Sequence, residues 1–159
     1  AGVILAHPFL EPLFANLGFW QEGAFVDALA RQSAVYLTHY LATGEATTEE
    51  ENLLLSKLLC GWPLQGDPVV LTEPLAKPEL READDVLRAV IEHWPAIGKA
   101  SPAGLREGFF AREARLQVRE NDWLLTVERK AQDLLLGQLP WGVSLIRAPW
   151  HDRFLKIEW

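Results

Sequence analysis

Hydrophobic residues recur at steps of three and four over most of residues 1–110, a spacing that is typical of amphipathic helices. The clearest example runs from Leu80 to Trp94, where one side is apolar, the other is charged, and Pro95 ends the helix. About five helices are expected here: a short one that begins at His7-Pro8, a long one from about Phe25 to Thr43, one that begins at Thr48, the Leu80–Trp94 helix, and a short one that begins at Ser101-Pro102.

Several residues between these segments indicate helix ends. Gly44 follows the long helix at a position where a left-handed glycine commonly ends one. Thr48 and Glu51 have the spacing of a capping box, in which two side chains satisfy free amides at a helix start. Four prolines in residues 61–78 predict an irregular connecting segment between two helices, with one short extended stretch at Val69–Leu71.

The period changes to two after Arg112, which indicates strands. Residues 114–118 and 123–127 alternate on either side of the turn-like residues 120–122, so they are expected to form a hairpin. A helical pattern returns from Lys130 to Gln138, and two strands close the chain. In the first of these strands, Val143 and Leu145 share a face; in the second, Leu155, Ile157 and Trp159 do.

This order of five helices, two strands, one helix and two strands predicts an α+β fold. Residues 1–110 would form a helical part packed with a small, mainly antiparallel four-stranded sheet in residues 111–159. A chain of 159 residues is expected to form a single compact domain. Because the sequence starts at Ala1 with an apolar run and contains no methionine, we expect it to be the C-terminal fragment of a longer chain.

The charge is unevenly distributed, which narrows the classes of partner. The net charge is −7, and residues 1–100 contain 6 Lys or Arg against 14 Asp or Glu, whereas residues 101–159 contain 9 against 8. Nucleic acids and anionic membranes both bind basic surfaces, whereas this chain is acidic overall. We therefore expect neither of them as a partner. No apolar run is long enough to cross a bilayer.

The sequence offers no pattern for catalysis or metal binding. None of the four histidines has a His or Cys partner at metal-ligand spacing, and neither a glycine-rich phosphate loop nor a nucleophile elbow occurs. The single cysteine, Cys60, excludes an internal disulfide, and we interpret it as a small buried hydrophobic residue. We therefore expect no enzyme activity, no catalytic residues, no cofactor and no metal site.

The C-terminal tryptophans are the best candidates for a contact surface. Trp141, Trp150 and Trp159 sit nine residues apart, and large aromatic residues near a terminus indicate that the terminus is packed against the rest of the chain. We interpret them, together with Arg147 and Arg153, as a partner-binding set, because tryptophan is favoured at interface hot spots. The alternative, in which all three rings pack between sheet and helices, stays open.

Several motifs along the chain resemble those of one protein family. They are His7-Pro8-Phe9-Leu10 with Leu13-Phe14 and Leu17-Gly18, Tyr36-Leu37-Thr38-His39-Tyr40-Leu41-Ala42-Thr43-Gly44, Leu55-x-Lys57-Leu58-Leu59-Cys60-Gly61, Ile91-x-x-Trp94-Pro95, Gly104-Leu105-Arg106-x-x-Phe109, Leu139-Pro140-Trp141-Gly142, Pro149-Trp150 and Glu158-Trp159. Together they resemble the C-terminal region of the tape measure proteins of extracellular contractile injection systems, which are phage-tail-like particles encoded by bacteria. The resemblance covers nearly the whole chain.

The resemblance implies a structural role. A tape measure protein sets the length at which the inner tube stops polymerising, and it occupies the tube lumen during assembly. A compact terminal domain would then anchor this length-determining ruler to the baseplate hub or spike, to the inner tube, or to a cap protein. It would be found in the bacterial cytoplasm during assembly and afterwards inside the particle. The family has no catalytic residues to carry over.

Two other functions are compatible with the residues alone. One is a small-ligand or carbohydrate-binding module that uses the C-terminal tryptophans as a platform. The other is a hydrolase, which would require a cleft with a strongly perturbed carboxylate or histidine. Self-association into a homo-oligomer is also left open.

Overall fold

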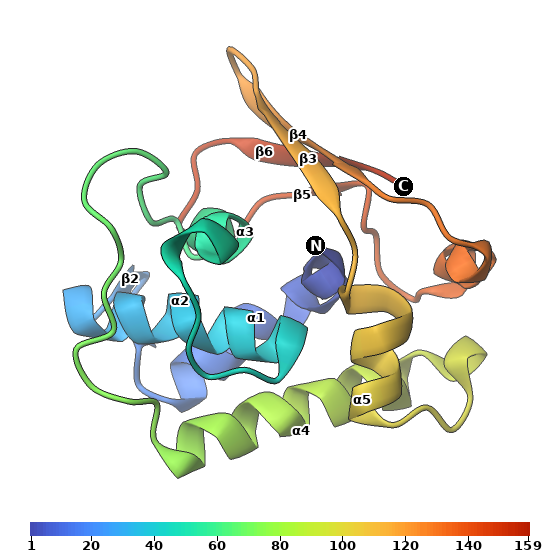
Figure 1. Ribbon diagram of the computed structural model, residues 1–159, viewed down its shortest axis with the longest axis horizontal. Helices are drawn as coiled ribbons and strands as arrows, with labels where there is room; N and C mark the ends of the chain where they lie inside the picture. The colour runs from blue at the N-terminus through green and yellow to red at the C-terminus, as the bar shows by residue number, and fades with distance from the viewer.

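Most of residues 1–110 fold into helices that pack around the first turn of the chain. The structure, a computed structural model, describes residues 1–159 (Figure 1). Its helical segments, with α for an α-helix and η for a 3₁₀- or π-helical segment, are η1 (Gly2–Ala6), α1 (His7–Asn16), α2 (Ala28–Thr43), η2 (Glu50–Leu53), α3 (Leu54–Leu59), α4 (Lys77–His93), η3 (Pro95–Ile97), α5 (Pro102–Leu105), η4 (Arg106–Phe110) and η5 (Ala131–Gln138). The buried segment η1 contacts α1, α2, α4 and η4, so it lies at the centre of the helical layer.

Gly2 explains how closely η1 approaches η4. A Cβ atom at this position would lie 1.7 Å from the carbonyl oxygen of Phe109, so only glycine allows the two backbones to pack in this way. The nitrogen of Ala1 donates to the carbonyls of Phe110 and Arg112 at 3.1 and 2.6 Å. These contacts join two segments that are far apart in the sequence.

A four-stranded sheet forms a second layer, drawn above the helices in Figure 1. Its strands are β3 (Ala114–Val118), β4 (Asp122–Val127), β5 (Leu145–Ile146) and β6 (Phe154–Glu158), and their order across the sheet is β3-β4-β6-β5. The prediction of an α+β fold is therefore confirmed. The predicted β3–β4 hairpin is also confirmed, with Leu116 opposite Leu125.

The pairing at the centre of the sheet differs from the expected, mainly antiparallel arrangement. The outer pairs, β3–β4 and β5–β6, are antiparallel, but β4 and β6 are parallel. Between these two strands lie η5 and β5, so the chain returns to the same end of the sheet before β6 begins. A second, two-stranded sheet, β1 (Trp20–Gln21) with β2 (Ala24–Phe25), is not predicted at all, because two-residue strands are too short to show a period.

The helix boundaries are shifted where side chains have other contacts. The long helix begins at Ala28 rather than at Phe25, because Phe25 pairs in β2 and the Asp27 carboxylate caps the helix by accepting from the amide of Ala30. The cap predicted at Ser101 is confirmed, since its hydroxyl accepts from the amide of Gly104 at 3.0 Å. The helix predicted from Lys130 to Gln138 is present as the 3₁₀ segment η5.

The predicted capping box at Thr48 and Glu51 does not form. Thr48 accepts from the Asn52 amide group instead, and the helix starts as the 3₁₀ segment η2. The neighbouring Glu50 makes contacts beyond its own helix: its carboxylate pairs with Lys57 at 2.6 Å and accepts a hydrogen bond from the amide of Val69 at 3.2 Å. This second bond, together with the bond from the Tyr36 hydroxyl to the Val69 carbonyl, holds residues 69–71 against the helices, so they join no sheet.

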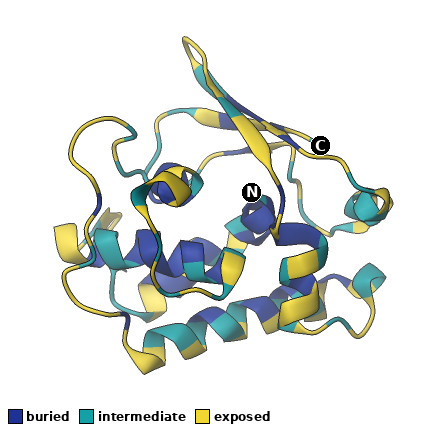
Figure 2. Ribbon diagram, in the orientation of Figure 1, coloured by how far each residue is buried: buried dark blue, intermediate teal, exposed yellow.

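The two faces of the sheet differ in burial, and buried and exposed residues alternate along its strands (Figure 2). The face toward the helices holds the buried residues Leu125, Ile146, Leu155 and Ile157. Leu145 is 52% exposed because it pairs with Lys156 on the outer face, and its neighbour Ile146 is buried instead. The hairpin end extends beyond the helical layer, which leaves the side chain of Val118 exposed (Figure 2).

The helical core generates a stability prediction. Leu87 on α4 is completely buried, so Leu87→Ala is expected to lower the free energy of unfolding by about 2–5 kcal/mol through lost burial and the cavity left behind. Leu134 on η5 is 87% exposed, and Leu134→Ala, as the matched control, should change this free energy by no more than about 0.5 kcal/mol. Urea unfolding of the 159-residue chain measures both, and equal effects would contradict the packing described here.

Candidate functional site

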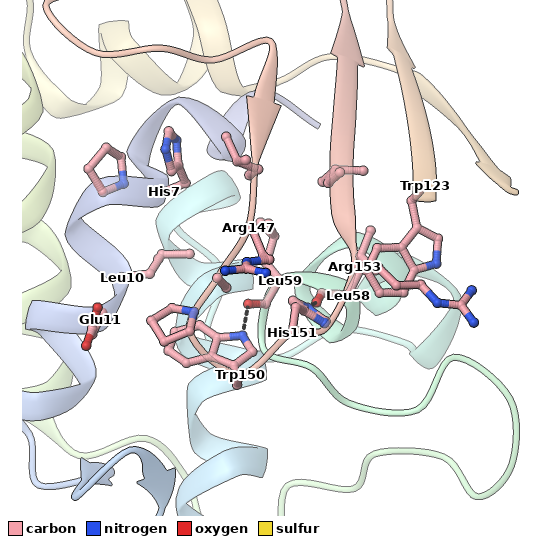
Figure 3. A pocket seen from close by; sticks show the side chains of 15 residues that line it. His7, Leu10, Glu11, Leu58, Leu59, Trp123, Arg147, Trp150, His151 and Arg153 are labelled. Carbon is pink, nitrogen blue, oxygen red and sulfur yellow. Dashed lines mark hydrogen bonds between the residues drawn. The ribbon is translucent and has the colours of Figure 1, made fainter. Parts of the chain in front are cut away.

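The C-terminal end of α3 is held by side chains from distant parts of the chain. The last carbonyls of a helix have no partner within the helix, so they need donors from elsewhere. The indole nitrogen of Trp150 donates to the Leu59 carbonyl at 2.7 Å, and Nε2 of the adjacent His151 donates to the Leu58 carbonyl (Figure 3). Trp150 and His151 lie in the connection between β5 and β6, so these bonds attach the sheet to α3.

Arg31 on α2 completes this arrangement. Its guanidinium donates to the next two carbonyls, those of Cys60 and Gly61, so each carbonyl from residue 58 to residue 61 accepts a side-chain hydrogen bond. Gly61 has a φ of +65°, and a Cβ atom there would lie 2.7 Å from the Arg31 guanidinium and 2.9 Å from the Trp150 ring. Glycine at position 61 therefore allows both the turn and the close approach of the two side chains. We call Arg31, Trp150 and His151 the α3 clamp.

Aromatic neighbours fix the position of Trp150. Its ring centroid lies 4.9 Å from that of Trp20, 5.2 Å from that of Phe25 and 5.6 Å from that of Phe14, at tilted or edge-on angles. Such arrangements are favourable beyond the area they bury. Trp150 is thus half-buried and held by contacts with α1, β1 and β2 as well as by its bond to α3.

A small pocket lies beside the α3 clamp. It has a volume of about 190 Å³ and is bounded by α1, the end of α3, β4 and the β5–β6 connection. Its apolar walls include Leu10, Leu59, Trp123 and Leu155. We call it the arginine pocket, because Arg147 and Arg153 also line it (Figure 3).

Both arginines lack a carboxylate partner within the chain. The Arg147 guanidinium carbon lies 5.1 Å from the ring centroid of Phe154, and that of Arg153 lies 5.8 Å from the ring centroid of Trp123. Neither arginine takes part in an ion pair. The one carboxylate among the residues that line the pocket, Glu11, extends from α1 at the end away from Arg153 (Figure 3).

The two histidines that line the pocket are held in their neutral form. Burial lowers the pKa of His7, although its bond to the Ile4 carbonyl opposes this shift. Burial also lowers the pKa of His151; the nearby Arg31 acts in the same direction, while the Leu58 carbonyl and Asp152 oppose it. The positive charge of the pocket near neutral pH therefore comes from the two arginines.

The structure brings together three of the five predicted contact residues: Trp150, Arg147 and Arg153 line the same pocket. Trp141 lies elsewhere, where its indole nitrogen donates to the Leu5 carbonyl at 2.9 Å and its ring packs edge-on against Phe9. Trp159 lies in a third place, beside Leu134 and Leu136 in an open hollow. All three tryptophans are half-buried, and the binding role of the set stays a prediction.

Sequence reasoning missed the other residues that shape the pocket. His151 was considered only as a metal ligand, and its position directly after Trp150 gives no sign that both side chains reach the same helix end. Trp123 lies in the predicted hairpin, but its contacts with His151 and Arg153 depend on the parallel β4–β6 pairing, which the sequence does not predict.

No group of three or more His, Cys, Asp or Glu side chains is arranged to hold a metal ion. No helix is both long and apolar enough to cross a membrane. Cys60 is buried, as predicted, and burial raises the pKa of its thiol to about 12, although the Thr38 hydroxyl and Arg31 act against this shift.

Comparison with known proteins gives the family. The model of the contractile injection system tape measure protein family matches residues 1–159 of the chain. The chain belongs to this family. The resemblance found in the sequence motifs is thereby confirmed, and the tape measure assignment extends over the helical layer, the sheet and the arginine pocket. Neither the curated proteins nor the solved structures gave a match.

The α3 clamp generates a second stability prediction for this tape measure domain. Trp150→Phe keeps an aromatic ring but removes the donor to the Leu59 carbonyl, so it should lower the free energy of unfolding by about 1–3 kcal/mol more than a matched substitution. The matched control is Trp62→Phe, since Trp62 is also half-buried but donates no hydrogen bond from its indole. Chemical denaturation measures the difference, and equal losses would show that the bond to α3 contributes no net stability.

The neutral histidines predict a dependence of stability on pH. The lowered pKa values of His7, His39 and His151 mean that the unfolded chain binds protons more readily than the folded one below about pH 6.5. The free energy of unfolding should therefore be greatest above that pH and fall between pH 7 and pH 5, by at most about 1.4 kcal/mol per pH unit for each histidine. His151→Gln, which removes one of these three groups, should reduce the slope. A slope that His151→Gln does not alter would contradict the assignment.

Proposed function

We propose that this tape measure domain is an assembly domain, which anchors the length-determining part of the protein to another protein of the injection particle. One observation carries the proposal: an apolar pocket is lined by two arginines that have no carboxylate partner within the chain. Arginine and aromatic side chains around an apolar pocket are common where one protein binds another. The family assignment of the whole chain supports a place in such a particle.

The chemistry of the titratable groups around the pocket suits binding better than catalysis. A general base or nucleophile needs a free proton-accepting or attacking atom near a substrate. His151 already donates from Nε2 to the Leu58 carbonyl, and Cys60 is a buried thiol whose raised pKa keeps it protonated. We therefore propose a function without enzyme activity.

The candidate partners are the inner-tube, hub or spike, and cap proteins of the same particle. A partner surface that carries carboxylates suits Arg147 and Arg153, while the acidic helical layer suits a basic surface elsewhere. A domain of this length has a radius of gyration of about 15 Å, which is compatible with a position beside or inside a tube channel. On this proposal the domain joins the particle in the bacterial cytoplasm and then stays within it.

One feature favours a second candidate function, the binding of a carbohydrate or another small ligand. Trp20, Phe25, Trp62 and Trp150 line an open groove of about 720 Å³ between the β1–β2 hairpin and the loop after α3. Flat aromatic rings in an open groove are suited to stacking against a ligand. This function predicts saturable binding of a ligand by the isolated chain, with no particle protein present.

A co-elution experiment tests the anchoring function. The tagged 159-residue chain is mixed separately with the purified hub, spike, first tube ring and cap proteins of its own system, and each mixture is analysed by size-exclusion chromatography. We expect one of these proteins to co-elute with the folded chain and none with the same chain after thermal unfolding. If the folded chain retains none of them, the anchoring function is wrong, and saturable binding in an oligosaccharide screen would favour the aromatic groove instead.

A further inference from the structure

We propose that the arginine pocket binds one large apolar side chain of a partner protein, next to an Asp or Glu in the partner's sequence whose carboxylate pairs with Arg147 or with Arg153. The inference rests on the proposed assembly function and specifies the segment that the domain recognises. The occupant is a short extended segment of another particle protein. The argument depends on the size of the pocket, its charge and its rigidity.

The size of the pocket suits a single side chain. Sites for whole small molecules commonly have volumes of about 300–1,000 Å³, and the arginine pocket, at about 190 Å³, is smaller than this range. Its walls are mainly apolar and include Leu10, Leu58 and Leu155, so a hydrocarbon or aromatic group is favoured inside it. A leucine, isoleucine or phenylalanine side chain has the right chemistry and the right size.

The charge around the pocket favours a carboxylate beside that side chain. The chain has a net charge of −7, yet the residues that line this pocket include two arginines and only one carboxylate, Glu11. The aromatic rings of Phe154 and Trp123 hold the guanidinium groups of Arg147 and Arg153 without using their hydrogen-bond donors. A partner carboxylate can therefore accept two hydrogen bonds from a guanidinium that gives up no existing partner.

The position of Glu11 indicates a direction for the bound segment. Glu11 extends from α1 at one end of the pocket, Arg153 lies beside Trp123 at the other, and Arg147 lies between them (Figure 3). A second carboxylate at the Glu11 end would be repelled. The acidic residue of the partner is therefore expected on the Arg147–Arg153 side of the inserted side chain.

The pocket is already formed before any partner binds. Trp150 and His151 are fixed to the carbonyls of α3, and Trp150 is further held by Phe14, Trp20 and Phe25. The partner segment does not have to order these walls, which reduces the entropic cost of binding.

A titration with peptides tests the inference on the intact chain. The probes are acetyl-Gly-X-Glu-Gly-amide and acetyl-Gly-Glu-X-Gly-amide peptides, with Leu, Ile or Phe as X, and the readout is the set of indole N–H signals of the ¹⁵N-labelled protein. At least one probe should shift the signals of Trp123 and Trp150 in a saturable way, while Trp94, buried in the helical core, should not respond. Replacing X by Ala should abolish the saturable shift, and replacing Glu by Gln should weaken binding about two- to fivefold, as is typical of a partly exposed ion pair.

Substitutions of the protein provide matched controls. At least one of the variants Arg147→Gln and Arg153→Gln should weaken binding of the Glu peptide about two- to fivefold and have little effect on the Gln peptide, and the variant that does so identifies the arginine that pairs with the carboxylate. Arg81→Gln, on the exposed face of α4 in the helical layer, should leave binding of both peptides unchanged. The unperturbed Trp94 signal shows that each variant is folded. If no probe gives a saturable shift, or if the arginine variants bind the Glu peptide as tightly as the original chain, the inference is wrong.

Failure of this inference can be told apart from failure of the assembly function. If a particle protein co-elutes equally well with the original chain and with the Arg147→Gln/Arg153→Gln double variant, the domain binds its partner through another surface, which overturns the inference and leaves the anchoring function standing. If no particle protein co-elutes but the peptides bind as expected, the anchoring function fails and the pocket is a peptide site. Self-association of the chain in sedimentation experiments that the double variant abolishes would assign the pocket to a second copy and overturn the proposed partner.

Discussion

The free carbonyls at the C-terminal end of α3 are the constraint on which much of this structure depends. The Leu58 carbonyl accepts from the Gly61 amide, but no backbone amide donates to the carbonyls of residues 59–61, and leaving these without donors would be costly. The α3 clamp supplies their donors from Arg31 on α2 and from Trp150 in the β5–β6 connection, and His151 adds a second donor to the Leu58 carbonyl. One helix end thus fixes the position of the sheet relative to the helical layer, and the arginine pocket forms beside that junction.

A second connection between the layers is made by Arg112, whose side chain is completely buried. It donates to the carbonyls of Gly108 and Glu128 and to the carboxylate of Asp133, so it links η4, the end of the hairpin and η5. Burial alone would raise the pKa of Asp133, but the hydrogen bonds from Arg112 and from the Lys130 amide, together with the charges of these two residues, outweigh burial and lower that pKa. The sheet is therefore attached at both ends, by backbone carbonyls at α3 and by a buried ion pair at η5.

These attachments bear on how the domain would function in assembly. An anchor must keep its binding surface in place under load, and a pocket between two firmly joined layers meets this requirement better than one on a loose loop. The positive charge of the pocket stands out against an acidic chain, which favours one orientation of an approaching partner. Three observations therefore support the proposed function: the family membership, the two arginines without a carboxylate partner, and the pre-formed pocket.

The sequence by itself determined the elements that depend on neighbouring residues: the helices around Tyr36 and Leu87, the cap at Ser101 and the β3–β4 hairpin. It also gave the α+β class, the family and three residues that meet at the arginine pocket. Only the tertiary structure decided the parallel β4–β6 pairing, the absence of a capping box at Thr48 and the separation of Trp141 and Trp159 from Trp150. The period of hydrophobic residues shows which face of a helix or strand is apolar. It does not show what packs against that face, because contacts such as that between Trp150 and Leu59 join residues 91 positions apart in the sequence.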